Sequence, residues 1–183
     1  ARKGALWLGS TTVVWQLVNW LLTILTARYL LPRDYGLMAL ADTVLSYLWI
    51  VASLGSNAWL LQAGTDSLVI IRSVWTLQLL MGIIITSVGL ITAPAISEFY
   101  QNPELVAPFR VVVCAFLLHS IWGMEETLLQ RELQFKRVSL VNLAVTLIRG
   151  FTQLGLAVAG YGVWALVLGI VLRELAAIAF YGS

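Results

Sequence analysis

The sequence is poor in charge and in the residues that metal and thiol chemistry require. Only 11% of its 183 residues are charged, whereas a typical soluble domain has about 25%. Its single cysteine, Cys114, permits no internal disulfide. The one histidine, His119, and this cysteine do not make a cluster of metal ligands. Basic residues exceed acidic ones by only two and are dispersed, so we expect no nucleic-acid partner. The sequence has no GxSxG motif of nucleophilic hydrolases, no phosphate-binding P-loop and no clustered Cys/His metal ligands. It therefore predicts neither an enzyme nor a metal or cofactor site.

What the chain has instead is long apolar runs. Hydrophobic residues make up 60% of the sequence, and the mean hydropathy is +0.90. Runs of about 20 apolar residues are typical of membrane-spanning helices, and these runs lack the alternation of barrel strands. We therefore expect an all-α integral membrane bundle of six transmembrane helices, one domain over residues 1–183. The expected spans are 5–29, 35–63, 68–96, 105–128, 138–159 and 163–181.

The polar segments between the runs predict the orientation. With six spans, both termini lie on one side of the membrane. That side would hold six basic residues: Arg2, Lys3, Arg72, Arg131, Lys136 and Arg137. The other side would hold three: Arg28, Arg33 and Arg110. The positive-inside rule then predicts that both termini are cytoplasmic.

Three charged residues fall within the last two runs. Arg149 precedes the turn residue Tyr161 by 12 positions, and Arg173 follows it by 12, which places both about 18 Å from the turn, near the bilayer midplane. A charge there costs several kcal/mol unless it faces a partner or a wet cavity. We expect Glu174 to pair with Arg149 across the hairpin, because neighbours such as Arg173 and Glu174 do not share a helix face. Two interpretations stay open: a neutralised pair that locks two helices, or a cationic patch in a transport cavity.

Two further polar residues lie within apolar runs. His119, in the fourth run, is expected to be a helix-packing histidine bonded to a neighbour, with a ligand or proton-relay role as the alternative. Asp42, in the outer third of the second run, fits a helix-start or interfacial carboxylate better than a functional one.

Three segments carry a family resemblance. They are Ala27–Leu37 (ARYLLPRDYGL), Leu129–Arg137 (LQRELQFKR) and Gly160–Val167 (GYGVWALV), with Asn102–Leu105 (NPEL) between the first two. They resemble segments of bacterial polysaccharide flippases, in the multidrug/oligosaccharidyl-lipid/polysaccharide exporter superfamily. They occur in the family's order and together extend over nearly the whole chain.

The resemblance implies the N-terminal half of a two-lobed fold, with six helices in each lobe and a central cavity between the lobes. It also implies movement of a polyprenyl-pyrophosphate-linked glycan across the bacterial inner membrane. Of the candidate substrate-binding residues, only Arg28 lies within a matched motif, at the outer membrane edge, where the motif is better explained as turn-forming. The candidate substrate-binding residues are therefore Arg149, Arg173, Glu174 and Arg28. Arg149 departs from the family pattern, in which a small or neutral residue is expected there.

One lobe cannot enclose a cavity between two lobes. Besides membrane lipids and a lipid-linked oligosaccharide, the expected partners therefore include a second membrane lobe or other membrane subunits. The alternative function is that of a truncated flippase-like protein, serving as a non-transporting structural subunit of a larger membrane complex. Ion-coupled drug export shares the superfamily fold, but the motifs favour the polysaccharide branch.

Overall fold

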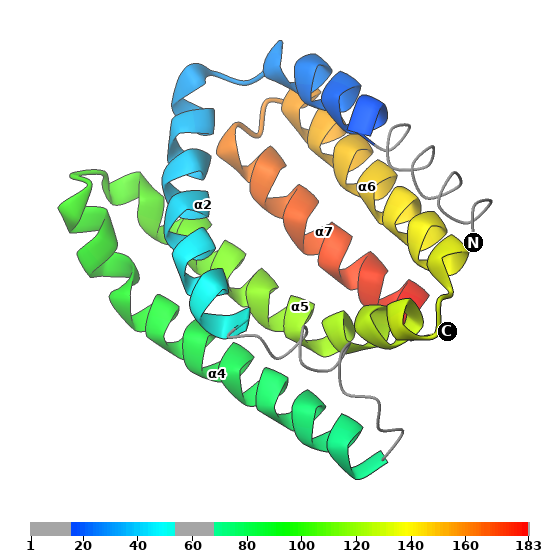
Figure 1. The fold of residues 1–183 in the computed structure, drawn as a ribbon. Coiled ribbons are helices and arrows are strands. Elements are labelled where there is room, and N and C mark those ends of the chain that lie inside the picture. The colour runs from blue at the N-terminus through cyan, green and yellow to red at the C-terminus, as the bar shows by residue number, and fades with distance from the viewer. Residues whose placement is uncertain (1–15, 54–67, 183) are drawn as a thin grey trace.

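The computed structural model describes residues 16–53 and 68–182, and all regular structure in those ranges is helical. Figure 1 shows the helices packed side by side, with a short 3-10 turn, η1 (Pro103–Leu105), leading into α5. The α-helices of the described residues are Gln16–Ala27, α2 (Pro32–Ser53), α4 (Leu68–Phe99), α5 (Val106–Arg131), α6 (Phe135–Val158) and α7 (Val163–Tyr181). The all-α fold class is confirmed.

Four of the expected spans coincide with helices that are long and apolar enough to cross a membrane. These are Arg72–Phe99, Pro103–Arg131, Phe135–Val158 and Val163–Tyr181. The expected spans 5–29 and 35–63 extend into residues 1–15 and 54–67, which lie outside the described residues. Their crossing of the membrane, and the cytoplasmic placement of both termini, therefore stay predictions.

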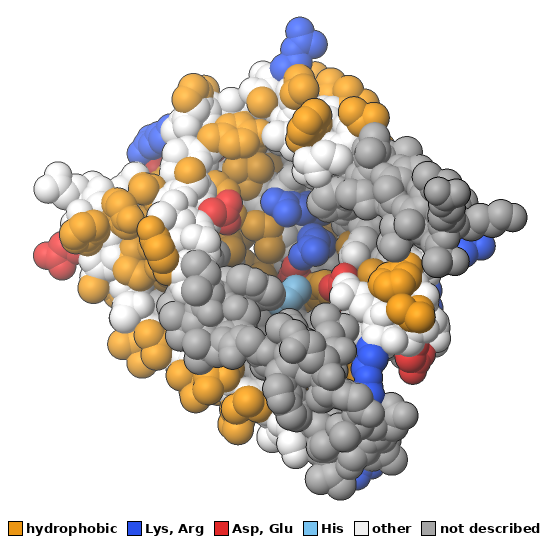
Figure 2. Space-filling model, viewed as in Figure 1, with side chains coloured by type: hydrophobic (Ala, Val, Ile, Leu, Met, Phe, Trp, Pro, Cys, Tyr) orange, Lys and Arg blue, Asp and Glu red, His pale blue; other side chains and the backbone are white. Residues whose placement is uncertain are grey.

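The distribution of side chains is the reverse of that in a soluble protein. Along α4, Leu80, Ile84 and Ile91 are 51%, 52% and 77% exposed, whereas Glu174 is buried inside the bundle at 4%. Large apolar side chains exposed in such numbers indicate a surface that faces lipid, and charged residues in membrane bundles face inward. Figure 2 shows the same pattern, with orange apolar side chains around the rim and charged side chains in a central hollow.

α7 is the central helix of the bundle. It packs between α5 and α6, while α4 covers the far side of α5 and α2 lies across α7, α5 and α4 (Figure 1). The helix Gln16–Ala27 approaches α6, where a Cβ on Gly150 would lie 2.3 Å from Leu22 Cδ1. Two core clusters join α2 to the helices it crosses, one around Val112 and Val167 and the other around Phe109 and Val113.

The start of α2 shows why its sequence breaks the first apolar run. Pro32 is the first helical residue, where its missing N–H costs nothing. The N–H of Leu31 donates to Asp34 Oδ2 at 3.1 Å, which is the backward half of a capping box. Arg33 Nη2 pairs with Glu104 Oε1 at 2.6 Å and ties this turn to η1. The resemblance segment here builds a helix start, as the turn-forming interpretation expects.

The predicted turn at 160–162 separates α6 from α7. Gly160 and Gly162 have φ values of +82° and +54°, which residues with a Cβ rarely adopt. A Cβ on Gly162 would also lie 3.1 Å from Asp34 Oδ1. Glycine at this position therefore lets the α6–α7 turn approach the start of α2.

We expect Gly82→Leu to loosen the packing of α4 against α5. A Cβ at Gly82 would lie 2.3 Å from Ser120 Oγ and 2.7 Å from Ser120 Cβ, and serine is too short to move aside. Overpacking of this kind typically costs about 1–3 kcal/mol, measurable by equilibrium unfolding in mixed micelles. Gly155→Leu is the matched control, because a Cβ at Gly155 meets nothing within 4 Å. Equal stability of the two variants would contradict the packing described.

Candidate functional site

A buried carboxylate on α7 is held by two side chains from α5. Glu174 Oε2 accepts a hydrogen bond from Trp122 Nε1 at 2.8 Å and lies 3.3 Å from His119 Nδ1. His119 and Trp122 are three residues apart on α5, so both point from the same helix face toward α7. The expectation that His119 is a packing histidine bonded to a neighbour agrees with this contact. The cluster locks α5 to α7 at the depth of the bundle interior.

Arg173, which precedes Glu174 on α7, completes the cluster of Glu174, His119 and Trp122. Its Nη1 donates to Glu174 Oε1, and its guanidinium carbon lies 5.7 Å from the centre of the Trp122 ring. The Trp122 ring also stacks on Tyr181 with centroids 5.0 Å apart and planes 6° apart. A carboxylate and an aromatic face thus both fix the Arg173 guanidinium, whose side chain is 27% exposed.

The predicted ion pair between Arg149 and Glu174 is wrong. Within the described residues, the direct ion-pair partners of Glu174 are Arg173 and His119. Arg149 makes no direct ion pair or hydrogen bond there, but its charge interacts electrostatically with Asp42 and Glu174. The prediction assumed that adjacent helix positions cannot meet. The arginine side chain is long enough to bend back to its neighbour, and Glu174 turns toward α5 and away from α6. The charge pair of the interior therefore forms within α7, between Arg173 and Glu174, and Arg149 is left outside it.

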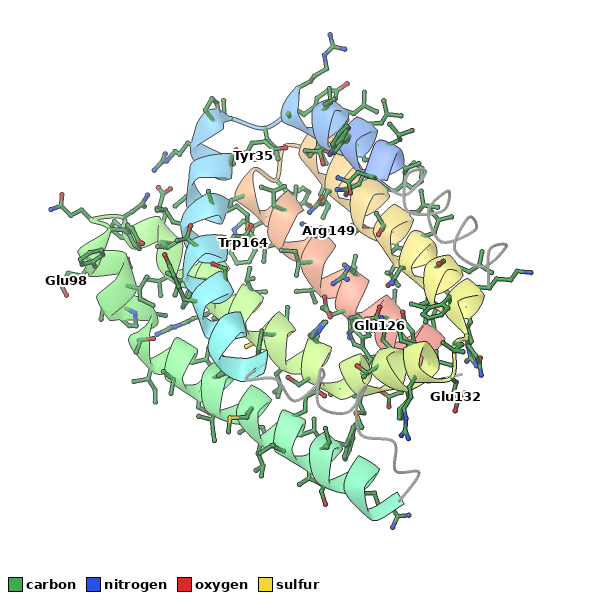
Figure 3. All side chains as sticks on the ribbon, viewed as in Figure 1. Tyr35, Glu98, Glu126, Glu132, Arg149 and Trp164 are labelled. Carbon is green, nitrogen blue, oxygen red and sulfur yellow. The ribbon has the colours of Figure 1, made fainter. Side chains whose placement is uncertain are left out.

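Arg149 instead faces a cavity of about 420 Å³. The cavity also receives Arg173 and Glu174 from α7 and His119 from α5, with Asp42 from α2 on the opposite wall. In Figure 2 basic and acidic side chains and the histidine gather in the central hollow, and Figure 3 shows Arg149 projecting from the middle of α6. Two guanidinium groups thus share one cavity with two carboxylates. The cationic patch in a transport cavity, which the sequence left as an open alternative, stays a prediction.

A smaller cavity of about 190 Å³ adjoins the first one. Asp42 and Arg149 line both. Asp42 lies ten positions beyond the first residue of α2, Pro32, so it is not a helix-start carboxylate, and the interfacial alternative stays a prediction. The sequence gives the position of Asp42 along the apolar run, but it does not predict that Asp42 lies on the side of α2 that faces the cavities.

Arg28 lies apart from the other predicted site residues. It is exposed in the turn between the first helix and α2 and lines neither cavity. Sequence reasoning also missed Trp122 and Tyr181, because aromatic residues in apolar runs are ordinary packing residues. The available signal was the spacing of His119 and Trp122, which places two hydrogen-bonding rings on one helix face.

A polar chain continues from this cluster toward the α5–α6 turn. Tyr181 donates its hydroxyl to Asn142 Oδ1 at 3.3 Å, and Asn142 Nδ2 donates to Glu126 Oε1 at 3.0 Å. Gln130 Nε2 donates to the same oxygen of Glu126 at 3.3 Å. These bonds join α5, α6 and α7 near the α5–α6 turn and the C-terminal end of α7. The helices that form the cavity walls are therefore held together by polar contacts as well as by apolar packing.

Comparison with known proteins agrees with the motifs. The sequence matches the family described as "Polysaccharide biosynthesis protein" over residues 25–182. It is 27% identical over 94 residues to the teichuronic acid biosynthesis protein TuaB of Bacillus subtilis (strain 168), a stretch that covers 51% of this chain and 20% of TuaB. The matched stretch thus spans about a fifth of that relative. No solved structure matches. The family match extends from the end of the first helix to the end of α7, and the chain therefore belongs to the polysaccharide biosynthesis protein family.

Proposed function

We propose that this chain forms part of the route by which a polyprenyl-pyrophosphate-linked glycan crosses the bacterial inner membrane. The observation that carries the proposal is Arg149, a guanidinium without an ion pair among the described residues, facing a cavity inside an apolar bundle. Membership of a polysaccharide biosynthesis family supports a glycan as cargo, and TuaB is named for the biosynthesis of such a polymer.

Two of the four charged residues that line the cavity, Arg149 and Arg173, suit an anionic group, and the other two are the carboxylates Asp42 and Glu174. A charge within a membrane costs several kcal/mol unless it is paired, and a diphosphate would supply the partner that Arg149 lacks. Guanidinium groups present a planar fork of donors that matches phosphate oxygens. Arg173 is already oriented by Glu174 and Trp122, so its remaining donors meet the ligand without further ordering.

The glycan itself requires a larger space than this bundle encloses. We infer that a second lobe, from the rest of the protein or from another membrane subunit, closes the route on the open side of the cavity. The apolar outer faces would lie against membrane lipid, with both termini in the cytoplasm.

Export in the native host tests the proposal. Arg149→Ala should reduce cell-surface polysaccharide and let the lipid-linked glycan accumulate, because the diphosphate loses its cationic partner. Arg110→Ala is the matched control, since Arg110 is exposed and lines neither cavity. Normal export by an Arg149→Ala protein that is merely less stable would reject the proposal and favour the non-transporting structural subunit.

A further inference from the structure

The smaller cavity has polar groups that the fold itself does not use. It lies between the first helix, α2, α6 and α7 and has a volume of about 190 Å³. Tyr35, on its α2 wall, has a buried hydroxyl oxygen without a hydrogen-bond partner. Buried hydroxyls are normally satisfied, because desolvation without a partner costs free energy. The Tyr35 hydroxyl is therefore a hydrogen-bonding group of a cavity-lining residue that the fold leaves unused.

Two further acceptors face the same cavity. Gln153 donates through Nε2 to the Leu166 carbonyl at 3.3 Å, and its carboxamide oxygen accepts no hydrogen bond within the described residues. The Asp42 carboxylate likewise has no hydrogen bond or direct ion pair there, and its charge interacts electrostatically with Arg149. Tyrosine can both donate and accept, whereas the two oxygens only accept. This set suits a ligand with several hydroxyl groups, each able to donate and accept, better than it suits another anion.

The order of residues along the helices fixes where such a ligand would lie. Tyr35 and Asp42 are seven positions apart on α2, about 10 Å along the axis. Arg149 and Gln153 are one turn apart on α6, with Gln153 nearer the α6–α7 turn. Asp42 and Arg149 border both cavities, and Gln153, which lines only the small one, places it on the side of Arg149 nearer the α6–α7 turn.

We propose that the smaller cavity is a subsite for a pyranose ring, with Tyr35, Gln153 and Asp42 as its hydrogen-bonding groups. This inference rests on the proposed function, because it places the first sugar of the glycan beside a diphosphate at Arg149. The lipid-linked glycan then enters the cavities in one orientation, with its sugar toward the α6–α7 turn and its phosphates toward Arg173.

Paired ligands that differ by one sugar test the subsite. Dissociation constants are measured in lipid nanodiscs for geranylgeranyl diphosphate and for geranylgeranyl diphosphate carrying one glucose. Tyr35→Phe should weaken binding of the glucosylated lipid about tenfold and leave the unsugared lipid unchanged. Its thermal unfolding should stay the same or rise, because the deleted hydroxyl has no partner. Tyr161→Phe, in an exposed turn position that lines neither cavity, is the matched control and should change neither constant.

The outcomes separate this inference from the proposed function. If Tyr35→Phe weakens both lipids equally, or neither, the sugar subsite is wrong while a diphosphate site at Arg149 stands. If the unaltered protein binds neither lipid, both proposals fail. If Arg149→Ala leaves the unsugared lipid unaffected, the diphosphate site fails whatever Tyr35→Phe does.

Discussion

Glu174→Ala should lower the free energy of unfolding of the bundle by about 3–5 kcal/mol, the usual cost of removing one partner from a buried ion pair. Glu174 is the shared acceptor for Arg173, Trp122 and His119. Without its carboxylate, one guanidinium and one indole N–H stay inside the bundle unpaired, and the link between α5 and α7 is lost. Equilibrium unfolding in mixed micelles measures the change.

Two variants control for this effect. Glu174→Gln keeps an acceptor for Trp122 but loses the charge that holds Arg173, so we expect an intermediate loss. Glu98→Ala removes an exposed carboxylate from α4 and should change stability by no more than about 0.5 kcal/mol. A Glu174→Ala protein as stable as the Glu98→Ala protein would show that the cluster does not hold the helices together.

In contrast to Glu174→Ala, Arg149→Ala should lower the stability of the bundle only slightly and should strongly reduce its affinity for the ligand. Within the described residues Arg149 has no direct ion pair or hydrogen bond to lose, and its removal takes from Asp42 only an electrostatic interaction across the cavity. A hydrogen bond to a charged group contributes about 1.5–3 kcal/mol, which predicts a dissociation constant about 10- to 100-fold higher for a polyprenyl diphosphate. Arg149→Lys should lie between, because an ammonium keeps the charge without the planar fork.

Binding and thermal unfolding of these variants are best measured on the same nanodisc samples. The contrast with Glu174→Ala is informative because both residues line the same cavity. If Arg149→Ala unfolded as readily as Glu174→Ala and bound the diphosphate normally, Arg149 would be a structural residue. The cavity would then need another explanation.

The sequence predicted well the positions of the charged residues along α6 and α7 but not the direction in which they point. Hydropathy and the Gly160–Gly162 turn located α6 and α7 to within a few residues, and symmetry about Tyr161 brought Arg149 and Arg173 into one cavity. Rotation of a helix about its axis depends on packing against its neighbours. For that reason the partner of Glu174 could not be deduced from spacing alone.

The family motifs and the cavity charges carry different information. The resemblance segments lie at helix ends, where Pro32, Asp34 and the turn glycines shape the backbone. The charged residues of the cavities lie in helix interiors outside those segments. The motifs therefore identified the family correctly, whereas the candidate site came from the physical cost of charge in an apolar helix.

The central claim is that the Arg149 cavity holds the diphosphate of a lipid-linked glycan, and crosslinking tests it most directly. A benzoylphenylalanine photocrosslinker is placed at Ser46, an exposed residue of α2 that lines the larger cavity, and separately at Ile84, which is 52% exposed on the outer face of α4. With radiolabelled geranylgeranyl diphosphate in nanodiscs, we expect crosslinking from position 46 that Arg149→Ala abolishes and excess inorganic pyrophosphate reduces. Crosslinking from position 84 should be weak and insensitive to both. Equal labelling from the two positions, unchanged by Arg149→Ala, would contradict the account.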